Sequence, residues 1–256
     1  MSPRRPPRPW VGPANPVEAA DLAGPRGLTE EVLGGDEGDP ALPDGPAGFY
    51  WSLLTPERQA RIQSVVDARL QSVTVVLDSL VDPHNTAAIL RTAEGLGLCR
   101  ALVVPHREGD AVAHRRVTQD AHKWLEIEAH PSGAEAAGKL RRDGYEVWAG
   151  HLDPAARLYT ALPADRPVAL LFGNEHEGPS PATLRACTGT FRIPMAGFTQ
   201  SFNVSVAAAI ALAQVAAARR RHLGAPGDLS LAARVALRDR FTLLAAKLAR
   251  RLKSPR

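Results

Sequence analysis

The sequence predicts an α/β domain built on a mostly parallel sheet with helices on both faces. Short and almost wholly apolar segments, such as residues 73–77 and 168–172, alternate with helical patterns. A strand without polar alternation is typical of a sheet covered on both faces, and strand–helix alternation is typical of α/β domains. In such sheets ligands bind beyond the carboxyl ends of the strands. We therefore expect the functional residues in the loops that follow the strands.

Composition limits the class of protein. The chain has 256 residues, of which 45% are hydrophobic, enough for a sizeable core in one large or two small domains. No segment approaches the roughly 18 uncharged apolar residues of a membrane-spanning helix. No apolar segment follows the N-terminal arginines, as a secretory signal would require. We therefore expect a cytoplasmic protein without a membrane partner.

Charge and metal-ligand patterns narrow the partners. The formal net charge is +4, which favours a polyanionic partner only where the positive charges cluster. Cys99 and Cys187 lack CxxC spacing, which fits a reducing compartment and excludes a thiolate zinc cluster. The eight histidines show no HExxH or other metal-like spacing, and we predict no metal site.

The chain divides into three segments of different composition. Residues 1–48 contain ten of the 22 prolines and lack apolar periodicity. Such a segment cannot bury enough surface to offset its ordering entropy, and we predict a disordered extension. Residues 49–222 form the predicted α/β domain, with a helical lead-in over residues 53–70. Residues 223–256 are predicted to form a basic amphipathic C-terminal helix.

Local signals predict the individual elements. Thr55 and Pro56 are typical of an N-cap and a first helical position, and an alanine-rich helix begins near Asn203. Apolar runs predict strands over residues 73–77, 101–104, 125–129, 145–149, 168–172 and 191–193. Amphipathic patterns predict further helices that begin near residues 86, 132 and 228, and residues 150–163 are expected to form a loop.

The first loop beyond a strand end, after residue 77, leads to Asn85 and Arg91. Asn85 can be a plain N-cap, and Arg91 can form a surface ion pair of little energetic value. Alternatively, Arg91 grips a phosphate in a fork geometry that lysine cannot reproduce. The residues alone leave both interpretations open.

The other two candidate loops follow residues 172 and 193. The loop over residues 173–178 begins and ends with glycine and contains Glu175. A glycine at a strand end allows close ligand approach, but the pattern is neither GxGxxG nor a phosphate-binding GxxxxGK[ST]. Nucleotide hydrolysis and hydride transfer are therefore poorly supported. In the third loop, unpaired amides near Asn203 can face a polar ligand, or Ser201 or Asn203 can be a plain N-cap.

Taken together, three stretches resemble the three motifs of the SpoU-type RNA 2′-O-methyltransferases of the SPOUT superfamily. They are DPHNTAAILRTAEGLG (82–97), LLFGNEHEGPS (170–180) and IPMAGFTQSFNVSVAAAIAL (193–212). The similarity covers about residues 53–222 and is closest to the tRNA guanosine-2′-O-methyltransferases of TrmH type. It implies a deep C-terminal trefoil knot, an exception to the rule that chains do not thread their own loops. It also implies S-adenosylmethionine as methyl donor and a homodimer.

The resemblance further implies roles for individual residues. Contacts to S-adenosylmethionine carry over to Gly150, Gly173, Ile193 and Phe202, although the family usually has threonine at position 150 and leucine at position 202. Catalytic or RNA-binding roles carry over to a second group, which is Asn85, Arg91, Glu175, Ser201 and Asn203.

RNA binding also requires phosphate contacts. The basic residues that can supply them are Arg115, Arg116, Lys123, Arg219, Arg220 and Arg221, together with Arg250, Arg251 and Lys253 on the final helix. Each group can instead be a solvated face. The resemblance implies tRNA methylated at the D-loop guanosine, nucleotide 18. The alternatives are ribosomal RNA or another tRNA nucleotide as substrate, and a catalytically silent RNA-binding protein on the same fold.

Overall fold

A computed structural model of the protein describes residues 45–106 and 121–253. Within these residues, seven strands form one sheet in the order β3-β2-β1-β6-β4-β7-β5, and each adjacent pair is parallel. The predicted α/β class is therefore confirmed. Residues 1–44 of the predicted extension lie outside the described residues. Residues 45–48 of that predicted extension belong to the first described helix.

The strands are β1 (Val73–Asp78), β2 (Arg100–Val104), β3 (Glu126–Ala129), β4 (Glu146–Gly150), β5 (Arg157–Leu158), β6 (Val168–Phe172) and β7 (Gly189–Arg192). The central strands β1 and β6 are buried along their whole length, which is why both are apolar runs. β5 falls in the predicted loop, because two residues carry no periodicity. β7 begins two residues before the predicted start. Its first residue is Gly189. A side chain at this position would meet the ring of Trp148 at 2.6 Å, which explains the glycine.

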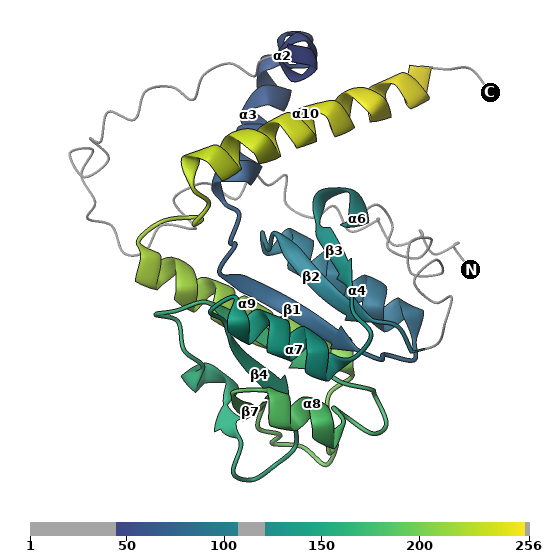
Figure 1. Ribbon diagram of the computed structural model, residues 1–256, viewed down its shortest axis with the longest axis vertical. Coiled ribbons are helices and arrows are strands. Elements are labelled where there is room, and N and C mark those ends of the chain that lie inside the picture. The colour runs from purple at the N-terminus through teal and green to yellow at the C-terminus, as the bar shows by residue number, and fades with distance from the viewer. Residues whose placement is uncertain (1–44, 107–120, 254–256) are drawn as a thin grey trace, which may run out of the picture.

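The helices are α2 (Gly45–Ser52), α3 (Pro56–Asp67), α4 (Pro83–Gly95), α6 (Ala121–Trp124), α7 (Gly133–Arg142), α8 (Pro181–Ala186), α9 (Val204–Leu223) and α10 (Leu231–Lys253), with a 3₁₀ turn, η2 (Tyr159–Ala161). α4 and α9 pack on one face of the sheet and α7 and α8 on the other (Figure 1). The prediction of helices on both faces is confirmed. No helix among the described residues is long and apolar enough to cross a membrane.

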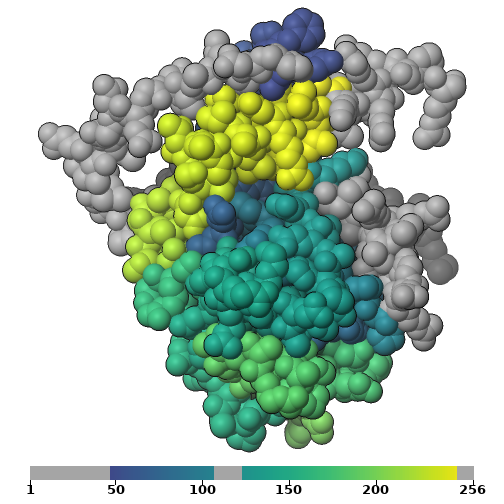
Figure 2. All heavy atoms as spheres, in the orientation of Figure 1, coloured from purple at the N-terminus to yellow at the C-terminus, as the bar shows by residue number. Residues whose placement is uncertain are grey.

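A further helical layer packs outside the sheet. Phe241 and Ala245 of α10 pack against Ile62 and Val66 of α3, and Trp124 of α6 meets the Phe241 ring edge-to-face at 5.1 Å. Figure 2 shows α10, in yellow, as a layer beside the teal and green part that holds the sheet and its helices. The predicted lead-in helix and the C-terminal helix are therefore packed against each other.

The last helix begins later than predicted because of Asp228. We expected the helix from residue 228, but the Asp228 carboxylate accepts hydrogen bonds from the backbone N–H groups of Gln71 (2.5 Å) and Ser72 (3.2 Å). α10 then begins at residue 231, and the Oγ of Ser230 accepts a hydrogen bond from the N–H of Ala233. A tertiary contact thus overrides the helical periodicity.

Candidate active site

Three loops meet at the carboxyl edge of the sheet, and Glu175 is their centre. Glu175 lies in the loop after β6, and its Oε2 accepts a hydrogen bond from the N–H of Val81 at 2.8 Å. Its Oε1 accepts from the N–H of Asp82 at 3.2 Å and from Nδ2 of Asn85 at 3.0 Å. The carboxylate therefore holds the start of α4 and the loop before it.

The hydrogen bonds to Glu175 keep its side chain ionised. Partial burial alone would raise the pKa of the carboxyl group, but the bonds from Asn85, Val81 and Asp82 outweigh it. The net effect lowers the pKa of Glu175 below its ordinary value of 4.5. The site consequently contains a fixed negative charge at neutral pH.

Asn85 and Asn203 connect this centre to the third loop. Nδ2 of Asn203 donates to Oδ1 of Asn85 at 3.1 Å, and Oδ1 of Asn203 accepts from the N–H of Ser205 at 2.8 Å. Asn203 is thus the N-cap of α9, as one interpretation held. Asn85 is not the N-cap of α4, because Asp82 occupies that position. The buried Asn85 instead joins the first loop to the second and third.

Arg91 and Ser201 lie on the surface. Arg91 is exposed on α4, two turns after its start, and Ser201 is exposed in the loop before α9. Lys123 is half-buried in α6. Arg115 and Arg116 lie outside the described residues.

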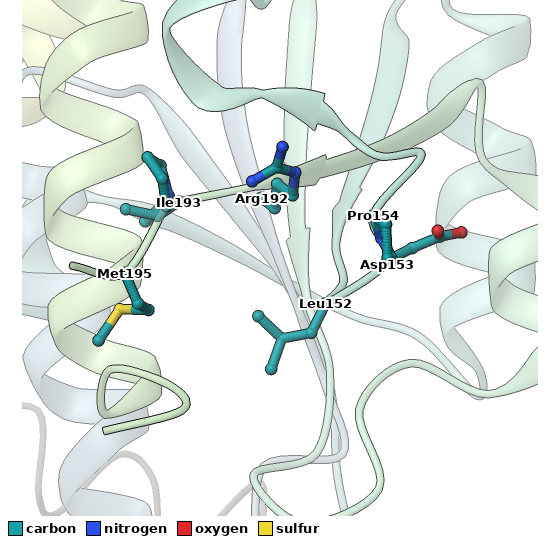
Figure 3. Close-up of a pocket in the computed structure, with 7 residues that line it drawn as sticks. Leu152, Asp153, Pro154, Arg192, Ile193 and Met195 are labelled. Atoms are coloured by element: carbon teal, nitrogen blue, oxygen red, sulfur yellow. The ribbon is translucent and has the colours of Figure 1, made fainter. Parts of the chain in front are cut away.

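A cavity of about 320 Å³ opens at the carboxyl ends of β4 and β7. Its walls come from the loop after β4 and the loop after β7, and are Leu152, Asp153, Pro154, Arg192, Ile193, Pro194 and Met195. Figure 3 shows the Leu152 and Met195 side chains on opposite sides of the opening. Five of its seven lining residues are apolar, and the place is the strand edge where α/β sheets bind ligands.

The two glycines expected to contact the cofactor differ in the space available for a side chain. A Cβ at Gly173 would meet the backbone carbonyl carbon of Gly178 at 2.5 Å, so only glycine allows this loop to close on itself. A Cβ at Gly150 would meet the rings of Phe172 and Phe191 at 3.5 Å, an ordinary contact. Ile193 lines the cavity, whereas Phe202 is exposed next to the N-terminus of α9.

Comparison with known proteins assigns this arrangement to a family. The family model described as "SpoU rRNA Methylase family" matches residues 72–213, more than half of the chain. The chain belongs to the SpoU methylase family. It is 37% identical over 158 residues to the tRNA (guanosine(18)-2′-O)-methyltransferase of Thermus thermophilus, which covers 62% of this chain and 81% of that protein. The Escherichia coli protein of the same name is 31% identical over 160 residues, 62% of this chain and 69% of the relative.

Solved structures of SpoU-type proteins share the fold. The A. aeolicus TrmH/SpoU tRNA modifying enzyme superposes with a TM-score of 0.66 at 26% identity, over 74% of this chain and 96% of that one. An AdoMet-bound rRNA methyltransferase from Sinorhizobium meliloti superposes with a TM-score of 0.51 at 28% identity, over 63% of this chain and 60% of that one. The predicted resemblance to SpoU methyltransferases is confirmed.

Two of the expected phosphate contacts, Arg219 and Arg220, form hydrogen bonds within the fold. Arg219 is buried, with Nε donating to Oγ of Ser72 at 2.8 Å and Nη1 to the carbonyl of Ala164 at 3.0 Å. Arg220 is half-buried; its Nη2 donates to the carbonyls of Ala68 (3.0 Å) and Leu96 (2.8 Å). Burial lowers the pKa of the Arg220 guanidinium, an effect that nearby Asp228 opposes.

These two arginines lie at the amino edge of the sheet, opposite the candidate site. Ala68 and Leu96 precede β1 and β2 in the chain. Periodicity alone could have separated the run, because residues 219 and 220 lie on the side of α9 that packs inward, whereas Arg221 is exposed. Arg221 keeps its place as a candidate phosphate contact.

Sequence reasoning missed two residues of the network, Asn174 and Ser79. Nδ2 of Asn174 donates to the backbone carbonyl of Ser79 at 3.1 Å. Ser79 has φ of 61° and is the one non-glycine residue with positive φ within the described part of the chain. The signal that could have found Asn174 is its place between Gly173 and Glu175 in the second loop.

Proposed function

We propose that this protein is an S-adenosylmethionine-dependent tRNA (guanosine(18)-2′-O)-methyltransferase. The observation that carries the proposal is the junction of three loops through Glu175, Asn85 and Asn203, with a cavity at the same carboxyl edge of the sheet. Relatives named for this activity are 31–37% identical over about two thirds of the chain. The site and the relatives support the same chemistry.

We infer that the cavity holds the nucleoside part of the cofactor. When bound, S-adenosylmethionine supplies a methyl group activated by its sulfonium sulfur. Apolar walls from Leu152, Ile193 and Met195 can hold a flat base. The backbone groups of the two loops that form the walls can supply the polar contacts. We infer that Gly173 and Gly150 serve the site by keeping the strand ends free of side chains.

Arg91 is proposed to stabilise the reacting ribose rather than to remove its proton. The 2′-hydroxyl needs to be held in place and its developing negative charge stabilised. A guanidinium remains protonated in proteins and has five donors but no acceptor. Arg91 therefore acts by forked hydrogen bonds to a phosphate of the RNA and by its positive charge. Its exposed position on α4 leaves room for a polynucleotide.

The remaining candidate residues are proposed to position this centre. Glu175 and Asn85 hold the first turn of α4, and Arg91 lies two turns further along the same helix. Asn203 ties that turn to α9, and Ser201 lies in the loop that leads into α9. Of the basic residues, Lys123 and Arg221 are proposed to contact tRNA phosphates, as are Arg115 and Arg116, which the structure does not describe.

We further propose that the C-terminal part of the chain forms a deep trefoil knot. Two features support it. β7 is inserted between β4 and β5, and α9 then returns along α4 and η2 on one face of the sheet. A return path through an existing loop would put the third loop of the site under topological constraint.

A homodimer in the cytoplasm is also proposed. Apolar side chains are exposed at the candidate site, namely Phe198 at 110%, Val206 at 44% and Phe202 at 39%. Such a patch is typical of a protein–protein contact. A second copy of the chain would cover it and complete the site from outside.

Ribosomal RNA is the second candidate substrate. The family model is described by rRNA methylation, and one structural neighbour is an rRNA methyltransferase. The fold and the network of Glu175 serve either substrate, since both reactions place a methyl group on a ribose hydroxyl.

The test is transfer of tritium from labelled S-adenosylmethionine to tRNA and to ribosomal RNA, followed by nucleoside analysis. We expect label as 2′-O-methylguanosine at nucleotide 18 of tRNA, lost with Arg91→Ala. Label in ribosomal RNA alone would establish the second candidate. Absence of label from a folded, cofactor-bound protein in both RNAs would reject the enzymatic function.

A matched pair of glycine variants tests the cofactor pocket. The methyl group of Gly173→Ala would push the backbone of residues 178 and 179 away from residue 173, whereas that of Gly150→Ala would make only ordinary contacts. Calorimetry with S-adenosylmethionine should show a loss of affinity of about tenfold or more for Gly173→Ala and less than about threefold for Gly150→Ala. Equal losses would mean that loop closure at Gly173 does not shape the pocket.

A further inference from the structure

Asn174 joins two loops of the site through both ends of its amide group. Its Oδ1 accepts hydrogen bonds from the N–H groups of His176 (2.9 Å) and Glu177 (3.2 Å), which folds the loop into a tight turn. Its Nδ2 donates across to the carbonyl of Ser79 at 3.1 Å. One side chain therefore sets both the shape of the second loop and its distance from the first.

The acceptor of that bond is held rigidly. Ser79 has a left-handed backbone, with φ of 61°, which is unfavourable for a residue with a side chain. Its N–H donates to the carbonyl of Val104 at 3.1 Å, and its Oγ donates to Oδ1 of Asp78 at 3.2 Å. The buried Asp78 in turn accepts from Oγ1 of Thr183 at 2.9 Å. β2 and α8 thus fix the conformation of the first loop at Ser79.

Glu175 follows Asn174 directly and depends on the distance between the loops. Its carboxylate spans the N–H groups of Val81 and Asp82 and the amide of Asn85, which lie two to six residues beyond Ser79. A shift of the second loop by the length of one hydrogen bond would break this contact. The amide of Asn85 would then lose the partner that orients it toward Asn203.

We propose that Asn174 is a positioning residue for methyl transfer, acting through Glu175 by holding the second loop against the carbonyl of Ser79. The inference rests on the proposed function. It adds a side chain that touches neither cavity nor exposed arginine but sets the geometry of both neighbouring loops.

Asn174→Asp isolates the bond between the loops. An aspartate keeps the two acceptor bonds to His176 and Glu177 but cannot donate to Ser79. We expect kcat for tRNA methylation to fall about 10- to 100-fold, with KM for S-adenosylmethionine changed less than about threefold. His176→Asp is the matched control, because it places a carboxylate on an exposed side chain of the same loop and leaves Asn174 in place. It should keep kcat within about twofold.

A double-mutant cycle with Glu175→Gln separates positioning from general loss of structure. If Asn174 acts through Glu175, then Asn174→Asp in the Glu175→Gln background should change kcat by less than about threefold. Full additivity, or an unchanged kcat for Asn174→Asp alone, would overturn the proposal. If Asn174→Asp does not fold, Asn174→Ser, whose short hydroxyl cannot reach both loops, replaces it in the same cycle.

A readout without RNA keeps this test separate from the proposed function. Carbon-13 NMR of the Glu175 carboxyl group reports its titration in wild type, Asn174→Asp and His176→Asp. The pKa of Glu175 should rise more in Asn174→Asp than in His176→Asp. Only in the first variant does the second loop shift, and that shift weakens the hydrogen bonds from Asn85, Val81 and Asp82 that lower this pKa. Equal titration in the two variants would overturn the positioning role even if the wild type methylates no tRNA. A wild type without transferase activity, but with the expected titration, would reject the proposed function and leave the loop geometry supported.

Discussion

The carboxyl and amino edges of the sheet both carry networks of charged and amide side chains, but they differ in burial. At the carboxyl edge, Glu175 and Asn203 join loops that remain open to solvent beside a cavity. At the amino edge, buried Arg219 and half-buried Arg220 donate to backbone carbonyls and to Ser72. Asp228 completes that edge by accepting from the start of β1.

This difference shows how burial decides what an arginine can do. Nε and Nη1 of Arg219 and Nη2 of Arg220 already have partners within the fold, which a phosphate would have to displace. Arg221, by contrast, is exposed on α9. In the run from Arg219 to Arg221, the first two residues therefore stabilise the fold, and Arg221 is the candidate for a phosphate contact.

The largest expected effect is at the carboxyl edge, on Arg91. Arg91→Ala should lower the rate of methyl transfer by about 10²- to 10³-fold, as for loss of a charge that stabilises a transition state. Arg91→Lys should lose most of this activity too, because an ammonium cannot form a fork. Initial rates with labelled cofactor measure both, with Tm as the control for folding. A lysine variant of nearly full activity would contradict the fork geometry.

At the amino edge we expect a loss of stability instead. Arg219→Ala leaves the carbonyl of Ala164 and the hydroxyl of Ser72 without their donor, which should lower the free energy of unfolding by about 2–4 kcal/mol. Urea denaturation measures it. Residual folded protein should retain its methyl-transfer rate per active site, and Arg221→Ala should unfold like wild type. A stable Arg219→Ala protein with weakened tRNA binding would erase the distinction between the edges.

A smaller effect is expected in tRNA affinity. Arg221→Ala should reduce the slope of log affinity against log salt by about one unit for a lost phosphate contact. Filter binding between low and moderate salt measures the slope, and Arg166→Ala, which removes an exposed arginine paired with Asp165, is the comparison. Identical slopes for wild type and Arg221→Ala would remove Arg221 from the RNA surface.

The smallest effect is the pH dependence of Glu175. Its folded pKa lies below 4.5, so the carboxylate contributes stability above that pH and loses it as the pH falls through the folded value. Wild type should therefore have a higher Tm than Glu175→Gln at pH 7, and the difference should shrink below about pH 4.5. Glu177→Gln, an exposed change in the same loop, is the control. A constant difference across this range would mean that the charge of Glu175 does not matter to the junction.

Local patterns were sufficient to predict most of the fold. The buried strands β1 and β6 follow from apolar runs, α3 follows from Thr55 and Pro56 at its start, and α7 follows from its helical pattern. β5, α8 and η2 escaped prediction because segments of two to six residues carry too little periodicity. The order of strands required non-local pairing and could not be read from any window of sequence.

The sequence by itself determined the chemistry available to this protein: Glu175 stands in a loop after a strand, Asn85 and Asn203 stand at the starts of helices, and Arg91 lies two turns along the helix that contains Asn85. Only the tertiary structure decided how they are joined, because each bond of the junction spans about 90 residues or more. It also decided that Arg219 supports the fold. The reason is burial, which depends on what packs against a side chain and not on the residues beside it in the chain.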